Sequence, residues 1–319
     1  MNNLSGNNKN TNLGFTATSA GNAFSLAVVF LLLFSIVWSL LSSVFKVYED
    51  LVFFANYIPA PLAVICTLLT LYIRGKKDCF ILLKLAKPSK NAILTTVLIT
   101  LGLVFGVSKI NEYFMLYMQV FFDAVTLPTM PTFSPLNLVL AIIFICIIPT
   151  ITEEILMRKI VLDGLEEAGE VFAVFAGGFI FAIFHMSPLQ TIYQFIVGSA
   201  FSYIVIKGGN YFVTMLAHLF NNLYIVLNYY IFKINSFYGI LEVIIPILAV
   251  LCFATGLVIL AKKESKLNAN FNKEKLVEFL IHYIWTQNTI QRTSNPNGIN
   301  IGLTKNYFTA NQTVAKHTP

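Results

Sequence analysis

Charge is scarce in this chain: Asp, Glu, Lys and Arg make up 11% of the 319 residues, while 57% are hydrophobic. The mean hydropathy is +0.74, and soluble domains carry about 25% charged residues. The composition therefore excludes a soluble fold and predicts an all-α, polytopic membrane protein. The net charge of +6 does not indicate a nucleic-acid partner, because Lys and Arg in cytoplasmic loops account for it.

Cysteine is also scarce, and no two of the four cysteines form a C-x-x-C pair. This excludes a disulfide framework and a zinc–thiolate site. Residues 1–22 are rich in Asn, Thr, Ser and Gly and contain little of the basic charge that precedes the apolar run of a signal peptide, with Lys9 alone. We therefore expect a disordered cytoplasmic tail there. An internal repeat that would indicate the duplicated halves of a transporter is lacking too.

Eight apolar stretches are candidates for helices that cross a bilayer, which takes about 20 residues. They are 23–44, 51–73, 91–110, 136–167, 171–186, 189–207, 211–232 and 240–261. Together they predict a transmembrane domain over 23–262, followed by a cytoplasmic tail over 263–319. Within this tail, the stretch 271–285 mixes Lys and Glu with Leu, Phe, Ile and Trp, which fits either an amphipathic helix on the membrane surface or a loosely ordered tail.

Every second loop between these stretches is basic, whereas residues 111–135 contain no Lys or Arg. Basic loops lie on the cytoplasmic side of a membrane. With eight spans, this pattern predicts a multi-pass protein of the plasma membrane with both termini in the cytoplasm. The basic residues that carry this prediction are Arg74, Lys76, Lys77, Lys84, Lys87, Lys90, Arg158, Lys159, Lys207, Lys262, Lys263 and Lys266.

Two adjacent glutamates, Glu153 and Glu154, follow the apolar stretch 136–151 after one threonine. A charged side chain at the bilayer centre costs roughly 2.5 to 3.5 kcal/mol on insertion scales, so such residues usually mark a functional site. Arg158 lies four residues after Glu154 on the same helix face, and the two are expected to form an ion pair. Glu153 points about 100° away and is left for chemistry.

Two further polar motifs lie in later apolar segments, and each pairs residues on one helix face: Phe181 with His185, and His218 with Asn222. Gly169 is the predicted turn between the helices that carry Glu153 and His185, each sixteen residues away. Equal distances from a turn place two residues of antiparallel helices at equal depth, here roughly 24 Å from it. By the same rise, His218 and Asn222 lie about 12 to 20 Å along their helix. The motifs are therefore expected to share one layer of the membrane.

Together these side chains have the chemistry for peptide hydrolysis, which needs an activated water, a group that orients it and donors for the oxyanion. Glu153 is the expected general base, and His185 is expected to hold the water or protonate the leaving amine. His218 and Asn222 are expected to donate to the developing oxyanion. No serine or cysteine stands with a histidine in an evident triad, so attack by water is favoured over a covalent route.

A zinc-dependent form of this reaction stays open, because two histidines and a glutamate are a familiar zinc set. The usual H-E-x-x-H spacing is absent, however. Each motif also has a structural interpretation: a charged helix end, a helix cap at His185, or hydrogen bonds between helices from His218. The neighbours Tyr193, Gln194 and Asn221 are interpreted as packing or supporting residues.

The complete, ordered set of motifs resembles that of the CPBP family, a group of intramembrane endopeptidases that includes CAAX proteases and bacteriocin-processing enzymes and is also called the Abi family. The matching motifs are Glu153-Glu154-x-x-x-Arg158, Phe181-x-x-x-His185 and His218-x-x-x-Asn222. The resemblance lies within a core at about 136–232, outside the first three segments and the tail. It implies an eight-helix intramembrane protease in which Glu153 and His185 activate water. It also implies that His218 and Asn222 form the oxyanion hole, with Glu154 and Arg158 as support.

The substrate expected from this resemblance is a membrane-associated or CAAX-like peptide or protein, and the expected partners include the lipid bilayer. The resemblance implies a cavity that opens to the cytoplasm or to the lipid. The main alternative is a catalytically silent bacteriocin-immunity or membrane scaffold protein, which would keep its function without the two glutamates. A proton-coupled transporter is a further alternative, since buried Glu and His residues can relay protons.

Overall fold

The computed structural model describes residues 15–43, 49–74, 88–122, 129–208, 210–232, 240–263, 267 and 269–289. These residues contain helices and connecting turns and no β-strand, which confirms the predicted all-α, polytopic fold. Six helices among them are long and apolar enough to cross a membrane, and Glu170–Phe184 is a shorter apolar helix. The number of eight spans stays a prediction. The basic loop residues Lys76, Lys77, Lys84, Lys87 and Lys266 lie outside the described residues.

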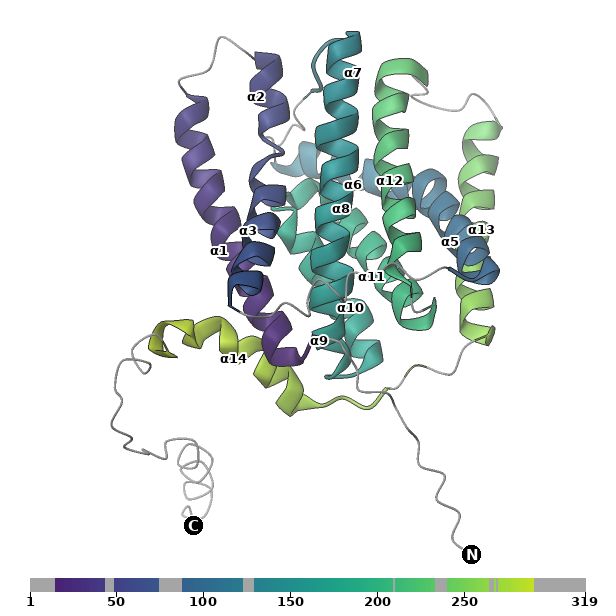
Figure 1. Ribbon diagram of the computed structural model, residues 1–319. Coiled ribbons are helices and arrows are strands. Elements are labelled where there is room, and N and C mark those ends of the chain that lie inside the picture. The colour runs from purple at the N-terminus through teal and green to yellow at the C-terminus, as the bar shows by residue number, and fades with distance from the viewer. Residues whose placement is uncertain are drawn as a thin grey trace, which may run out of the picture. The chain divides into compact units, whose positions relative to one another are not determined.

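The chain divides by its contacts into Met1–Tyr283 and Ile284–Pro319, and the packing given below is that of the first unit. Figure 1 shows the helices of this unit. In the ranges given next, η marks a π-helix, except for η4, which is a 3-10 helix. The elements are α1 Ala17–Ser42, α2 Glu49–Ala55, α3 Pro59–Ile73, α5 Lys90–Gly102, η1 Leu103–Val107, α6 Ser108–Phe122, α7 Pro135–Ala141, η2 Ile142–Ile147, α8 Ile148–Glu154, η3 Ile155–Val161, α9 Leu162–Glu166, α10 Glu170–Phe184, η4 Pro188–Gln190, α11 Thr191–Gly208, α12 Tyr211–Leu227, η5 Asn228–Phe232, α13 Leu241–Lys263 and α14 Lys273–Thr289.

Polar residues set the starts of several helices. The Thr16 hydroxyl accepts the N–H of Ser19, so α1 begins at Ala17, six residues before the predicted start at 23. Ser134 caps α7 in the same way, with Pro135 in the first turn. Proline also explains a break in the second predicted span, because Pro59 has no N–H to continue the helix from α2. The third span extends to Phe122 instead of ending at 110.

One long helical segment, from α7 through η2, α8 and η3 to α9, runs through the middle of the unit in Figure 1. α12 packs against η2 and α8, α3 against α8, and α1 against η3 and α9. α8 is only seven residues long and stands between two π-helical segments, with Pro149 in its first turn. π-Helical segments are rare and occur frequently at functional sites.

The α10–α11 pair packs closely through glycines. A Cβ added at Gly198 of α11 would lie 2.8 Å from the Gly178 Cα of α10 and 3.0 Å from the Phe181 Cβ. Small residues let helix backbones approach in membranes, where water does not drive helices together. The crossing therefore fixes the end of α10 that leads to His185.

Gly198→Ala is expected to lower the free energy of unfolding by about 1–3 kcal/mol, because the new methyl group must displace backbone. Thermal unfolding in detergent measures the loss. Gly208→Ala is the matched control in α11, since a Cβ there meets only the Ala92 Cβ at 3.7 Å, an ordinary contact. Equal melting temperatures for the two variants would contradict the close crossing.

Part of the predicted tail is ordered, because residues 273–289 form α14. Phe279 is buried against α1, where a Cβ at Gly21 would meet its backbone. The Asn272 N–H donates to the Ala168 carbonyl at 2.9 Å, and the Lys275 ammonium lies 3.8 Å from a Glu167 carboxylate oxygen. This part of the tail is therefore a docked helix and not a loose chain. Residues 1–14 and 290–319 lie outside the described residues.

Candidate active site

Glu153 and Glu154 end α8 and are both buried. Glu154 is 0% exposed and accepts hydrogen bonds at both carboxylate oxygens. Its Oε2 accepts from the Thr214 hydroxyl at 2.8 Å, and its Oε1 lies 3.1 Å from His218 Nδ1. A carboxylate only accepts when ionised, so His218 carries its proton on Nδ1 in this contact. Glu154 therefore fixes the tautomer and the orientation of the His218 ring.

Arg158 forms the predicted ion pair with Glu154, with its Nε 3.6 Å from Glu154 Oε2. The side chain is 1% exposed. Its guanidinium carbon lies 4.8 Å from the centre of the Phe181 ring and 5.7 Å from that of Phe201. The faces of aromatic rings attract a cation, so Phe181 and Phe201 supply contacts that the single carboxylate does not.

His185 caps the C-terminus of α10. Its Nδ1 lies 2.8 Å from the Phe181 carbonyl oxygen. A carbonyl only accepts, so Nδ1 donates there, and Nε2 of the neutral ring keeps its lone pair. The next residue, Met186, has a φ of 49°, a left-handed conformation that ends the helix directly after His185. The end of α10 therefore fixes the direction in which the unprotonated His185 Nε2 points.

The Glu153 carboxylate lies between the two imidazoles. Its Oε2 is 3.7 Å from His185 Nε2 and 4.0 Å from His218 Nε2. This oxygen is buried and has no hydrogen-bond partner among the described residues. Both distances exceed those of a direct hydrogen bond and suit groups that are bridged by one small molecule such as water. The structure thus brings Glu153, Glu154, Arg158, His185 and His218 together, as the motifs predict.

Asn222 forms its hydrogen bonds with residues that lie outside the set of predicted site residues. Its amide nitrogen donates to the Ile145 carbonyl of η2 at 3.1 Å, and its amide oxygen accepts from Asn221 at 3.1 Å. Among the described residues, no hydrogen bond joins Asn222 to Glu153 or to either histidine side chain. Its place in an oxyanion hole stays a prediction.

Two supporting residues escaped the sequence analysis: Thr214, which donates to Glu154, and Phe201, which faces Arg158. Thr214 lies four residues before His218 on the same face of α12, so the helical period contains the signal for it. Phe201 carries no such signal, because its contact depends on how α11 packs. Tyr193 and Asn221, interpreted as packing or supporting residues, form a hydrogen bond next to Asn222.

The metal hypothesis finds no support in the grouping of the donors. Within the described ranges, no three His, Cys, Asp or Glu side chains are grouped so that they could hold a metal ion. One nitrogen of each site histidine is bonded, to Phe181 or to Glu154, and Nε2 of each ring stays available. The reaction proposed below uses Glu153 and His185 to activate water and routes no step through zinc.

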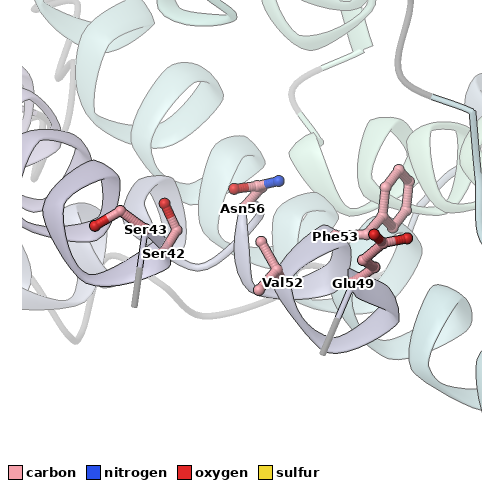
Figure 2. A pocket seen from close by; sticks show the side chains of 6 residues that line it. All are labelled: Ser42, Ser43, Glu49, Val52, Phe53 and Asn56. Carbon is pink, nitrogen blue, oxygen red and sulfur yellow. The ribbon is translucent and has the colours of Figure 1, made fainter. Parts of the chain in front are cut away.

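A cavity of about 500 Å³ lies elsewhere, at the ends of α1 and α2. Figure 2 shows its lining, which is Ser42, Ser43, Glu49, Val52, Phe53 and Asn56. None of these residues belongs to the three motifs. The geometry of the buried carboxylates and imidazoles, and not this cavity, therefore identifies the candidate site.

Comparison with known proteins agrees with the motifs. No curated protein and no solved structure matches the chain. Residues 135–224 match a family model described as type II CAAX prenyl endopeptidase Rce1-like, and this segment runs from α7 into α12 and contains all three motifs. The segment 135–224 is therefore similar to the Rce1-like CAAX endopeptidase family, which confirms the resemblance to the CPBP group.

Proposed function

We propose that the protein is an intramembrane endopeptidase that hydrolyses peptide bonds of membrane-associated or CAAX-like substrates with water as the nucleophile. The supporting observation is the position of Glu153 Oε2, buried and 3.7 and 4.0 Å from two imidazole nitrogens. A buried carboxylate beside a basic nitrogen suits a general base that acts on water. We place the protein in the plasma membrane, with eight spans and both termini in the cytoplasm.

The reaction begins with attack of the water oxygen on the carbonyl carbon of the substrate, as Glu153 takes one water proton and His185 Nε2 orients the water. A C–O bond forms, and the carbonyl oxygen becomes an oxyanion. In its imidazolium form, His218 donates to the oxyanion from Nε2 while Glu154 holds Nδ1. Asn222 donates from its amide nitrogen, which carries two hydrogens. Donors placed at the developing charge lower the barrier.

Collapse of the intermediate breaks the C–N bond and leaves a carboxyl group on one fragment. The proton taken from water passes to the nitrogen of the leaving amine. In the proposed reaction, Glu153 delivers this proton, or passes it to His185, whose Nε2 lies 3.7 Å from Glu153 Oε2. Glu154 and Arg158 take no proton and keep His218 in place.

Cleavage of membrane-anchored peptides tests this function. Purified protein in liposomes is incubated with a mixed panel of anchored peptides, with and without prenyl groups, and fragments are identified by mass spectrometry. We expect cleavage by the wild type and none by His218→Ala. Leu216→Ala is the control, because Leu216 lies on the same helix with an exposed side chain. A folded wild type that cleaves no peptide would support the silent scaffold instead.

Chelation tests the metal-free reaction. Treatment with a strong zinc chelator, followed by its removal, is expected to leave the cleavage rate unchanged, because in the proposed reaction Glu153 and His185 activate the water themselves. The measurement is the initial rate before and after treatment, with a zinc protease as positive control. A loss of activity that added zinc restores would contradict the metal-free reaction.

A further inference from the structure

A chain of three hydrogen bonds links α11, α12 and η2 next to the site. The Tyr193 hydroxyl donates to the Asn221 side-chain oxygen at 2.6 Å. The Asn221 amide nitrogen donates to the Asn222 oxygen at 3.1 Å, and the Asn222 amide nitrogen donates to the Ile145 carbonyl at 3.1 Å. Tyr193 and Asn221 are each only 8% exposed. The function proposed above assigns no role to either of them.

The acceptor at the end of this chain is the backbone carbonyl of Ile145, which lies in the π-helical segment η2, four residues before Pro149. Pro149 has no N–H and so cannot supply the α-helical bond to this carbonyl. The Asn222 amide nitrogen donates to it at 3.1 Å. Asn222 thereby ties α12 to the segment that carries Glu153, four residues beyond Pro149.

The direction of every bond in the chain is fixed from this end. A carbonyl cannot donate, so the Asn222 nitrogen must face Ile145 and its oxygen must face Asn221. Asn221 must then present its nitrogen to Asn222 and its oxygen to Tyr193. The Tyr193 hydroxyl is left as the donor. Removal of the hydroxyl would leave the Asn221 oxygen without its donor, and so loosen the Asn221 amide that donates to the Asn222 oxygen.

The orientation of the Asn222 amide has a larger energetic effect because the network is buried. Polar groups in a low-dielectric interior bind more strongly and polarise one another along a network. His218 lies one helical turn before Asn222 on the same face of α12. The amide that the network orients therefore stands on the face of α12 that meets the Glu153 carboxylate through His218.

We propose that Tyr193 and Asn221 are positioning residues, which hold the Asn222 side chain where its amide nitrogen meets the Ile145 carbonyl and so support the contact between α12 and the Glu153-bearing segment. The expected effect of these residues on the reaction rests on the proposed function. The existence of the hydrogen-bond network does not. Neither residue touches the reacting atoms; both act through Asn222.

Tyr193→Phe removes only the hydroxyl and is expected to lower kcat by about two- to tenfold, the effect of one lost hydrogen bond, with KM unchanged. Tyr203→Phe is the matched control, because Tyr203 is a half-buried tyrosine of the same helix with no hydrogen bond found among the described residues. Wild-type kcat in Tyr193→Phe, or an equal loss in Tyr203→Phe, would overturn the proposal.

A cycle of unfolding measurements tests the network without an activity assay. Melting temperatures are measured in detergent for Tyr193→Phe, Asn222→Ala and the double variant. Residues in one network give a double variant whose loss is smaller than the sum of the single losses, and this is the expected result. Strictly additive losses would overturn the network. If the wild type cleaves no peptide, the proposed function fails, and this cycle still decides the inference.

Discussion

Replacement of Glu153 with glutamine is expected to lower kcat/KM for peptide cleavage by about a thousandfold, within the usual range for loss of a general base. Glutamine keeps the size of the side chain and one oxygen, but it cannot take a proton from water. The oxygen in question is the one held 3.7 Å from His185 and 4.0 Å from His218. Initial rates on the best peptide of the panel measure the effect.

Glu242→Gln is the matched control for this experiment, because Glu242 is an exposed carboxylate in the first turn of α13. Its rate is expected to equal that of the wild type. Thermal unfolding of both variants checks that the chain is folded. Cleavage by folded Glu153→Gln at the wild-type rate would remove Glu153 from the reaction.

The second large effect concerns stability. Arg158→Met is expected to lower the free energy of unfolding by about 3–5 kcal/mol, the typical cost when one partner of a buried ion pair is removed. Methionine fills much of the space between Phe181 and Phe201, but the Glu154 carboxylate is left charged in the interior, with the Arg158 guanidinium gone. Thermal or denaturant unfolding in detergent measures the loss.

An exposed pair supplies the control. Lys109→Met breaks an ion pair to Glu112 whose side chains are 23% and 49% exposed, so its expected cost is about 1 kcal/mol or less. Addition of Glu154→Gln to Arg158→Met removes the uncompensated charge and is expected to recover part of the stability. It does not restore catalysis, because the His218 contact with the carboxylate is lost. A loss for Arg158→Met no larger than that for Lys109→Met would contradict the buried pair.

The sequence predicts the site well where the signal is local. The helical period places Glu154 and Arg158 on one helix face. Glu153 and His185 lie equally far from the turn at Gly169, which places them at the same depth in the membrane. The structure confirms both predictions, at 3.6 Å and 3.7 Å. These contacts follow from residue spacing along a helix, which a sequence displays directly.

Contacts that depend on packing between helices could not be predicted. The direction of the Asn222 amide follows from its bond to the Ile145 carbonyl, and so from the approach of α12 to η2, for which the sequence has no signal. The early start of α1 at Ala17 depends on the Thr16 cap and on the carboxylate of Glu167, which accepts the Ala17 N–H from a distant part of the chain. Apolar composition alone marks only the lipid-facing part of such a helix.

The nucleophile is tested most directly by a single-turnover reaction in heavy-oxygen water, with the intact mass of the protein followed over time. We predict one heavy oxygen atom in the new carboxyl group of the product and an unchanged protein mass at every time point, because water attacks the peptide bond itself. A protein species heavier by one substrate fragment, formed before product appears, would show a covalent intermediate and contradict the role given to Glu153.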